Sequence, residues 1–130
     1  MDAKALEAVP LFAGLSRKER EHVARRADDI DVPAGAHLMD QGGSAHEFFV
    51  ILEGAVEVTK DGDRLTELGP GDFCGEIALV EHGRRSASVV ATTPVHAIVM
   101  HSRDFAAMQA EIPHVTEKIH EAIRERMARG

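Results

Sequence analysis

The stretch GEIALVEHGRRSASV, residues 75–89, decides how the rest of this sequence is interpreted. It sets Glu76 beside a glycine at the start of a short apolar run, and it sets Arg85 nine positions later. Glycine lets a backbone approach a ligand closely, and the run EIALV is long enough for one helical turn. Two interpretations are open at this point: a capped turn followed by a solvated strand, or a loop that binds a ligand.

The second interpretation has a specific chemistry. The N-terminus of a helical turn presents unpaired N–H groups and attracts an anion. Arg85 adds a two-pronged guanidinium that matches phosphate oxygens, and Ser86 adds a hydroxyl and an N–H group. Glu76 would repel a phosphate, so its carboxylate suits the hydroxyl groups of a sugar joined to that phosphate. A basic side chain for a phosphate, Arg85, and an acidic side chain for sugar hydroxyls, Glu76, together indicate a nucleotide as the ligand.

The sequence on both sides of this stretch is typical of short strands joined by tight turns. Turn signals recur about every 8 to 12 residues, which is the spacing of a β-sandwich or barrel. They fall at Pro33–Gly35, Gly42–Ser44, Gly54, Asp61–Asp63, Gly69–Gly71, Gly83 and Thr93–Pro94. The segments between them include EFFVILEG, AVEVTK, RLTELG, SASVVAT and VHAIVM. This pattern predicts an antiparallel β-roll of the jelly-roll type, because a doubled sheet buries one face of every strand.

Both ends of the chain are predicted to be helical. Ser16 and Glu19 form a capping-box pattern, and Pro113 is placed to start a last helix. That helix carries an apolar stripe formed by Val115, Ile119, Ala122, Ile123 and Met127. We expect a single domain over residues 1–130, mainly β with flanking helices (α+β). Its parts are a helical entry at 1–28, the β-roll at 29–101 and C-terminal helices at 102–129.

Composition excludes several classes of function. The chain of 130 residues has a formal net charge of -7 and only 4% aromatic residues, which argues against direct binding of nucleic acid. It has no apolar run near the roughly 18 residues that a membrane helix needs, so we expect no membrane partner. Cys74 is the only cysteine, and a lone cysteine suits a reducing compartment. These features predict a cytoplasmic domain.

The sequence predicts neither a metal site nor a catalytic residue. His46–Glu47 followed by LEG loosely resembles the first metal-binding motif of the cupins, which share the jelly-roll architecture. That motif needs a second histidine nearby and a further ligand from a later strand, because zinc or iron takes three or more protein ligands. Neither Cys74 nor any serine lies in a nucleophile motif. We therefore predict that the domain is not an enzyme and needs no cofactor.

A longer stretch, GDFCGEIALVEHGRRSASV, closely resembles the phosphate-binding cassette of cyclic nucleotide-binding domains. Such domains occur in bacterial cyclic AMP receptor proteins and in protein kinase regulatory subunits. The family pattern is roughly G-D-F-x-G-E-x-A-L followed by R-x-A-x-V. It is met by Gly71, Asp72, Phe73, Gly75, Glu76, Ala78 and Leu79, then by Arg85, Ala87 and Val89. The resemblance extends over nearly the whole chain, through VPLFAGLSRKE at the entry and FFVILEGAVEV in the centre.

The resemblance implies a role for each residue of the cassette. Glu76 would bind the ribose 2′-hydroxyl and Arg85 the cyclic phosphate. The remaining residues of the predicted site are Gly75, Ile77, Ala78, Ser86 and Ala87. Bacterial cyclic AMP receptors also have a serine at the position of Ser86, and that serine contacts the phosphate. A serine used in this way would recognise the base only weakly. We therefore expect a cyclic nucleotide as ligand, with cyclic AMP favoured over cyclic GMP.

The family also implies a regulatory role. Ligand binding is expected to move the C-terminal helix, and the output would be an effector protein or a fused output domain that the sequence does not identify. The chain either works alone on another protein or is one domain of a longer product. Two alternatives remain open: a degenerate domain that acts through protein contacts without a nucleotide, and a cupin-like metal enzyme.

Overall fold

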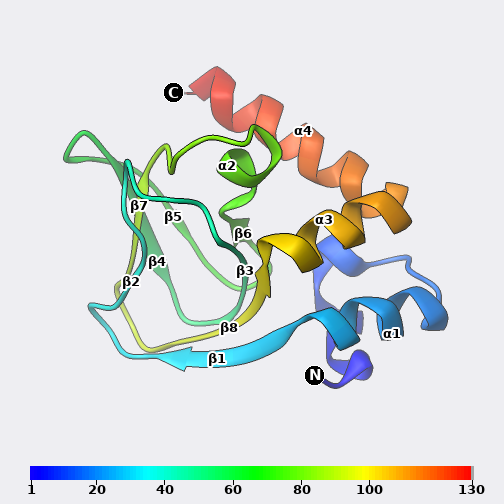
Figure 1. Cartoon of the computed structure of the whole chain (residues 1–130). Coiled ribbons are helices and arrows are strands. Elements are labelled where there is room, and N and C mark those ends of the chain that lie inside the picture. The colour runs from blue at the N-terminus through cyan, green and yellow to red at the C-terminus, as the bar shows by residue number, and fades with distance from the viewer. Residues whose placement is uncertain (130) are drawn as a thin grey trace.

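The computed structural model describes residues 1–129, and it consists of a roll of strands with helices gathered on one side (Figure 1). Two four-stranded antiparallel sheets form the roll, with the strand orders β1-β8-β3-β6 and β2-β7-β4-β5. The strands are β1 (Asp28–Val32), β2 (His37–Met39), β3 (Glu47–Glu53), β4 (Val56–Lys60), β5 (Asp63–Leu68), β6 (Phe73–Cys74), β7 (Ser88–Ala91) and β8 (Val95–His101). The predicted fold class, an antiparallel β-roll with helices at both ends, is confirmed.

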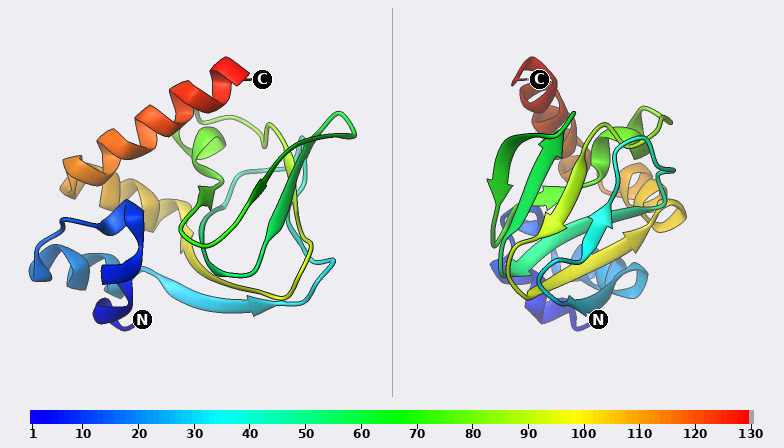
Figure 2. Two further views of the ribbon diagram at one scale, coloured as in Figure 1. Left: turned by 180° about the vertical axis from the view of Figure 1, so that it is seen from behind. Right: turned by 90° about the vertical axis from the view of Figure 1, so that its left-hand side faces the viewer.

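The helices come from both ends of the chain and from the cassette. They are the 3-10 turns η1 (Ala3–Ala8) and η2 (Pro10–Phe12), and the α-helices α1 (Arg17–Arg26), α2 (Glu76–Val80), α3 (Ser102–Glu111) and α4 (Pro113–Arg129). The capping box at the start of α1 is present, since Ser16 accepts from the Glu19 amide and Glu19 accepts from the Ser16 amide. Seen from behind, α1, α3 and α4 still lie on one side of the roll (Figure 2). None of the helices within residues 1–129 has the length and apolar character needed to cross a membrane.

The sheet β1-β8-β3-β6 separates two hydrophobic cores. In β3, Phe48 and Val50 face the helices, whereas Phe49 and Ile51 face the interior of the roll. A strand that is covered on both faces has a continuous run of apolar residues in its sequence, without alternation between apolar and polar residues. This explains why EFFVIL carries no alternation, although Val56 and Val58 in the second sheet alternate with polar residues as predicted.

The turn between β4 and β5 is tight and well defined. Asp61 and Gly62 both have positive φ, at 54° and 84°, and Lys60 pairs with Asp63 across the turn. Two consecutive residues with positive φ form a type I′ turn, for which Asp-Gly is a preferred sequence. The turn sets the pairs Lys60–Asp63 and Thr59–Arg64, and a bulge then shifts the register before Val58 pairs with Thr66.

Helix α4 packs along most, but not all, of its predicted stripe. Val115, Ile119 and Ile123 are buried in the core between the helices and the first sheet. Met127 is 59% exposed, so the prediction that it packs with the others is wrong. The last turn of α4 lies above the end of the roll that carries α2 (Figure 1), and the Met127 side chain there is left exposed. The end of α4 is therefore held by something other than apolar packing.

Candidate functional site

The part of the cassette that carries the predicted site residues, 75–89, consists of Gly75, α2, an irregular loop at 81–87 and the start of β7. Gly75 joins β6 to α2 in the left-handed conformation, with φ of 94°. A Cβ atom at this position would lie 2.7 Å from the carbonyl oxygen of Glu47 and 3.0 Å from Nη1 of Arg85. Both the backbone conformation and the close approach therefore require glycine here.

Arg85 is buried, with 6% of its surface exposed. Its Nη1 donates to the Gly75 carbonyl at 2.8 Å, and its Nη2 donates to the Glu47 carbonyl at 2.5 Å. Burial lowers the pKa of this guanidinium from its ordinary value. A guanidinium has five N–H groups, so these two bonds fix its plane and leave donors for an anion. Such an anion would meet a cation that is already held in position.

Glu76 is the second buried charge, with 1% exposed. Arg126 comes from α4, and its Nη1 contacts both carboxylate oxygens of Glu76. The distance to Oε2 is 2.6 Å. Arg126 also donates from Nη2 to the Phe73 carbonyl at 2.5 Å, and its guanidinium lies 5.0 Å from the centre of the Phe73 ring. Burial raises the pKa of Glu76, and the positive charge of Arg126 opposes that rise. The ion pair thus lets a carboxylate exist at a site with almost no contact with water.

The structure brings Glu76 and Arg85 together at one end of the roll, since Arg85 bonds the carbonyl of the residue just before Glu76. Ser86 is exposed and Ala87 half-buried on the outgoing side of the same loop. Ala78 is buried within α2. Ile77 points elsewhere, because its side chain packs against the helical core. Only the backbone of Ile77, and not its side chain, is therefore placed to contact a ligand in the roll.

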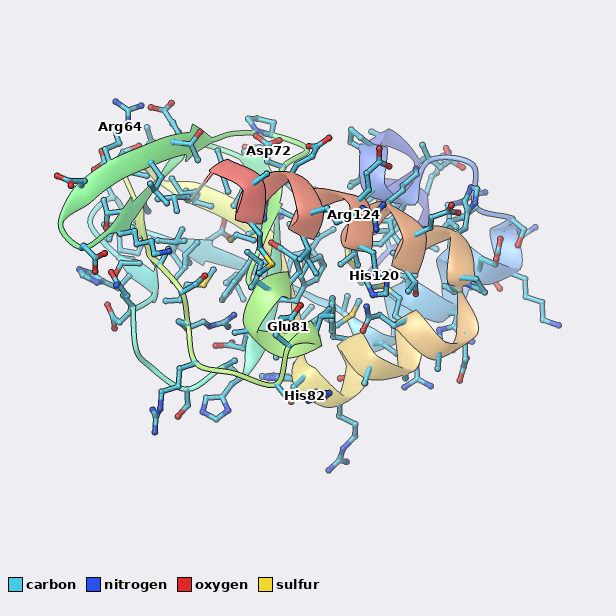
Figure 3. All side chains as sticks on the ribbon, turned by 90° about the horizontal axis from the view of Figure 1, so that it is seen from above. Arg64, Asp72, Glu81, His82, His120 and Arg124 are labelled. Atoms are coloured by element: carbon cyan, nitrogen blue, oxygen red, sulfur yellow. The ribbon has the colours of Figure 1, made fainter. Side chains whose placement is uncertain are left out.

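A groove of about 620 Å³ lies between α2 and α3, away from Glu76 and Arg85. Its lining includes Leu79, Val80, Phe105 and Ala106, with His82 at the rim, but neither Glu76 nor Arg85. Figure 3, seen from above, shows Glu81 and His82 where the end of α2 meets the start of α3. The groove lies between the cassette and α3 and is separate from the two buried charges.

Sequence reasoning missed three parts of this arrangement. Arg126 was not singled out as a site residue, yet it reaches the buried carboxylate. Glu47 contributes a backbone carbonyl, which no side-chain pattern reveals. Gly42 and Gly43 bond the backbone of Arg85 on both sides, at 2.8 and 2.9 Å. Their only signal was the Gly42–Ser44 turn pattern, which indicates a turn but not its partner.

Cys74 lies in the interior of the roll and is 3% exposed. Burial raises the pKa of its thiol to about 12. At neutral pH it is therefore a thiol and not the thiolate that a nucleophile or a redox centre requires. Among residues 1–129, no group of three or more His, Cys, Asp or Glu side chains is arranged to hold a metal ion.

A comparison with protein-family models matches residues 30–111 to the cyclic nucleotide-binding domain. This stretch contains the whole cassette and most of the roll. The chain therefore belongs to the cyclic nucleotide-binding domain family, and the resemblance noted in the sequence is confirmed. Helix α4, including Arg126, lies outside the matched residues.

The curated relatives that this chain matches are longer proteins, a potassium channel and a protein kinase regulatory subunit among them. It is 36% identical over 119 residues to a cyclic nucleotide-gated potassium channel of Rhizobium etli, which covers 92% of this chain and 33% of the channel. It is 37% identical over 92 residues to a cAMP-dependent protein kinase regulatory subunit of Aspergillus fumigatus, covering 69% of this chain and 22% of that subunit. The chain thus spans a third or less of the length of these relatives.

Among solved structures, the chain is similar to the catabolite activator protein of Thermus thermophilus. The TM-score is 0.80 at 27% identity, over 92% of this chain and 58% of that chain. The arrangement of two antiparallel sheets with flanking helices is thus shared with a known member of the family.

Proposed function

We propose that this chain is a non-catalytic sensor domain that binds a cyclic nucleotide, with cyclic AMP favoured over cyclic GMP. The observation that carries the proposal is that the cassette buries two opposite charges, Arg85 for the phosphate and Glu76 for the ribose 2′-hydroxyl. A purely structural role does not explain why both charges are withdrawn from water, since burying a charge is costly. A ligand that carries a phosphate and a sugar hydroxyl uses both.

Binding is further proposed to move helix α4. Arg126 reaches from α4 to the carboxylate that the ribose hydroxyl would use. A carboxylate accepts about four hydrogen bonds, but a hydroxyl that arrives at Glu76 competes with Arg126 for the best directions. The ligand would thus alter the contact that holds the end of α4. It shifts the helix only by the difference in its affinity for the two arrangements.

Cyclic AMP is proposed to be favoured because Ser86 gives guanine no hydrogen bond, so that the polar edge of guanine would lose water without gaining a partner. Ser86 is exposed beside Arg85 and follows it directly in the loop. With its hydroxyl and N–H committed to the phosphate, it would not read the edge of guanine. Cyclic AMP is then favoured by about tenfold, which corresponds to about one net hydrogen bond.

One observation favours a second candidate, a domain that keeps the fold but binds no nucleotide. Glu76 is already paired with Arg126 through both of its carboxylate oxygens. If that pair were permanent, the domain would act through contacts with another protein. Since the relatives are much longer than this chain, the effector in either case is a fused output domain or a separate protein.

Thermal unfolding with and without nucleotide separates the two candidates. At a ligand concentration about 100-fold above the dissociation constant, binding stabilises the folded state by about 2.7 kcal/mol. For a domain of this size the melting temperature should then rise by about 10 °C. The expected result is a larger rise with cyclic AMP than with cyclic GMP, and at the same ligand concentration a clearly smaller rise in an Arg85→Ala variant. An unchanged melting temperature at millimolar concentrations of both nucleotides would favour the domain without a ligand.

A further inference from the structure

The loop after β2, residues 40–43, is bonded to the cassette along its length. The Gly42 amide donates to the Arg85 carbonyl at 2.8 Å, and the Arg85 amide donates to the Gly43 carbonyl at 2.9 Å. The Gln41 amide donates to Oγ of Ser88 at 2.9 Å. The backbone of Arg85 is therefore paired on both its N–H and its C=O, within a loop that otherwise has neither helix nor strand.

The same loop is bonded on its other side to the β4–β5 turn. Nε2 of Gln41 donates to Oδ1 of Asp61 at 2.9 Å, and the Asp61 amide donates to Oε1 of Gln41 at 2.9 Å. Both polar atoms of the Gln41 side chain thus meet one residue, and that residue belongs to a rigid type I′ turn. We call this two-bond contact the Gln41–Asp61 bridge.

The bridge lies at the surface, where a single hydrogen bond contributes little net stability. Its effect depends on what it joins. One partner is fixed by the hairpin, and the other is a glycine-rich loop with no core side chain of its own to anchor it. Gly42 has a positive φ of 81° with open space around it, so packing does not fix this segment. Arg84 bonds the Gly42 carbonyl and Gly43 bonds Asp40, but the side chain of Gln41 is what joins the loop to the β4–β5 turn.

We propose that Gln41 is a positioning residue for the phosphate end of the cassette, acting through the Gln41–Asp61 bridge. The bridge ties residues 40–43 to the β4–β5 turn, and residues 40–43 in turn hold the backbone of Arg85 where its guanidinium can meet an anion. Gln41 itself does not touch the ligand. This inference rests on the proposed function for its binding tests, but not for the exchange measurement described below.

The direct test is the affinity for cyclic AMP of a Gln41→Ala variant, measured by calorimetry. We expect a three- to tenfold weaker affinity (roughly the effect of one to two exposed hydrogen bonds), with a melting temperature close to that of the unsubstituted protein. Gln109→Ala, at the chain's other glutamine, is the matched control and should bind normally. In an Arg85→Ala background, Gln41→Ala should cost no further affinity, because its effect passes through Arg85. A full additional loss in that background would overturn the proposal.

A pair of variants tests the bridge by loss and rescue. Gln41→Glu places a carboxylate against the carboxylate of Asp61 and should weaken binding at least as much as Gln41→Ala. The double variant Gln41→Glu/Asp61→Asn restores a donor opposite an acceptor and keeps a residue suited to the type I′ turn. Its affinity should return to within about twofold of the unsubstituted protein. Failure of the double variant to recover any affinity would count against the bridge.

Hydrogen–deuterium exchange without nucleotide tests the inference independently of the function. In Gln41→Ala, the amides of Gly42 and Arg85 should exchange faster than in the unsubstituted protein, while the β3 and β8 amides stay unchanged. If no nucleotide binds the unsubstituted protein but this exchange result holds, the proposed function fails and the bridge stands. If the two amides exchange at their original rates, the bridge does not position Arg85.

Discussion

The two ends of the cassette hold their buried charges in different ways. Arg85 is fixed by backbone carbonyls of Gly75 and Glu47, both of which belong to the roll. Glu76 is instead paired with a side chain from α4, a helix that follows the roll in the chain. The phosphate end is therefore complete within the roll, whereas the ribose end depends on the position of a terminal helix.

This difference indicates how a small domain can combine affinity with a response. An end that is preorganised loses little entropy on binding and can supply most of the affinity. At the ribose end, Glu76 must exchange part of its contact with Arg126 for the ligand, which couples ligand binding to the position of α4. The near end of α4 is anchored by Val115 and Ile119 in the core, and Lys118 donates to the Pro10 carbonyl at 3.0 Å. Only the far end, near Arg126, is then free to respond.

The largest expected effect is at the preorganised end. Arg85→Ala should weaken cyclic AMP binding by roughly 10- to 100-fold, because a charge-assisted contact contributes about 1.5 to 3 kcal/mol. Arg84→Ala is the comparison variant and should lose much less, because Arg84 is exposed and its bond to the Gly42 carbonyl at 3.2 Å reaches only the loop beside Arg85. Calorimetric titration of both variants measures the contrast. Small and equal losses would mean that Arg85 is an ordinary strand-end residue.

At the other end, Arg126→Ala leaves Glu76 buried without its cationic partner. The free energy of unfolding should fall by about 1 to 3 kcal/mol at neutral pH, as for an unpaired buried polar group. Arg126→Lys, which keeps the charge but not the two-pronged geometry, should lose less. Denaturant unfolding of the three proteins measures the effect. No loss in Arg126→Ala would show that the ion pair holds nothing in place.

The same variant has a predicted dependence on pH. Burial already raises the pKa of Glu76, and removing Arg126 takes away the charge that opposes the rise. An acid with a raised pKa in the folded state contributes stability that is present at low pH and lost as the pH rises through that pKa. The stability deficit of Arg126→Ala should therefore shrink as the pH is lowered toward the ordinary pKa of glutamate, about 4.3. A deficit that is constant with pH would contradict this assignment.

Gly75→Ala tests the link between the two ends. The φ of 94° and the 2.7 Å approach to the Glu47 carbonyl should together cost about 2 kcal/mol of stability and disturb Arg85. Gly35→Ala is the control, since Gly35 has a similar φ of 89° with nothing within 4 Å of the added Cβ atom. That variant should lose only about 1 kcal/mol and keep its nucleotide affinity. Equal behaviour of the two variants would mean that the close approach at Gly75 has no consequence.

The smallest effect is expected at Ser86. If its hydroxyl serves the phosphate, Ser86→Ala should weaken cyclic AMP and cyclic GMP alike, by about three- to tenfold, and keep their ratio. Competition titrations with both nucleotides measure the ratio. A selective loss of cyclic GMP would show that the hydroxyl reads the guanine base.

The sequence predicted the fold because its strongest signals are local. Turn residues such as Asp61 and Gly62 specify their own turn, the capping box at Ser16 specifies the start of α1, and apolar runs specify buried strands. Less regular strands were not singled out: β2 has three residues and β6 has two, which is too short for any periodicity to show. The first strand, β1, begins at Asp28 with three acids in five residues, so its polar composition hid it.

The cassette could be located from sequence because its residues are close together in the chain. Its supports could not, because they are distant and act mainly through backbone atoms. Arg126 is 50 residues from Glu76, and nothing in a helical pattern states which basic residue of a turn reaches inward. Glu47 acts through a carbonyl that every residue possesses, and Gln41 acts through a bridge to a separate hairpin. Such partners are set by the three-dimensional fold alone.

The most direct test of the account is hydrogen–deuterium exchange of the whole domain with and without saturating cyclic AMP. Exchange should slow at residues 84–88, where the preorganised phosphate end gains its ligand. It should also change at residues 123–128, the end of α4, with no change at residues 115–119, which stay anchored. Protection at 84–88 with an unchanged α4 would show that the ribose end does not couple to the helix. Unchanged exchange at both ends would contradict the claim that the cassette binds cyclic AMP.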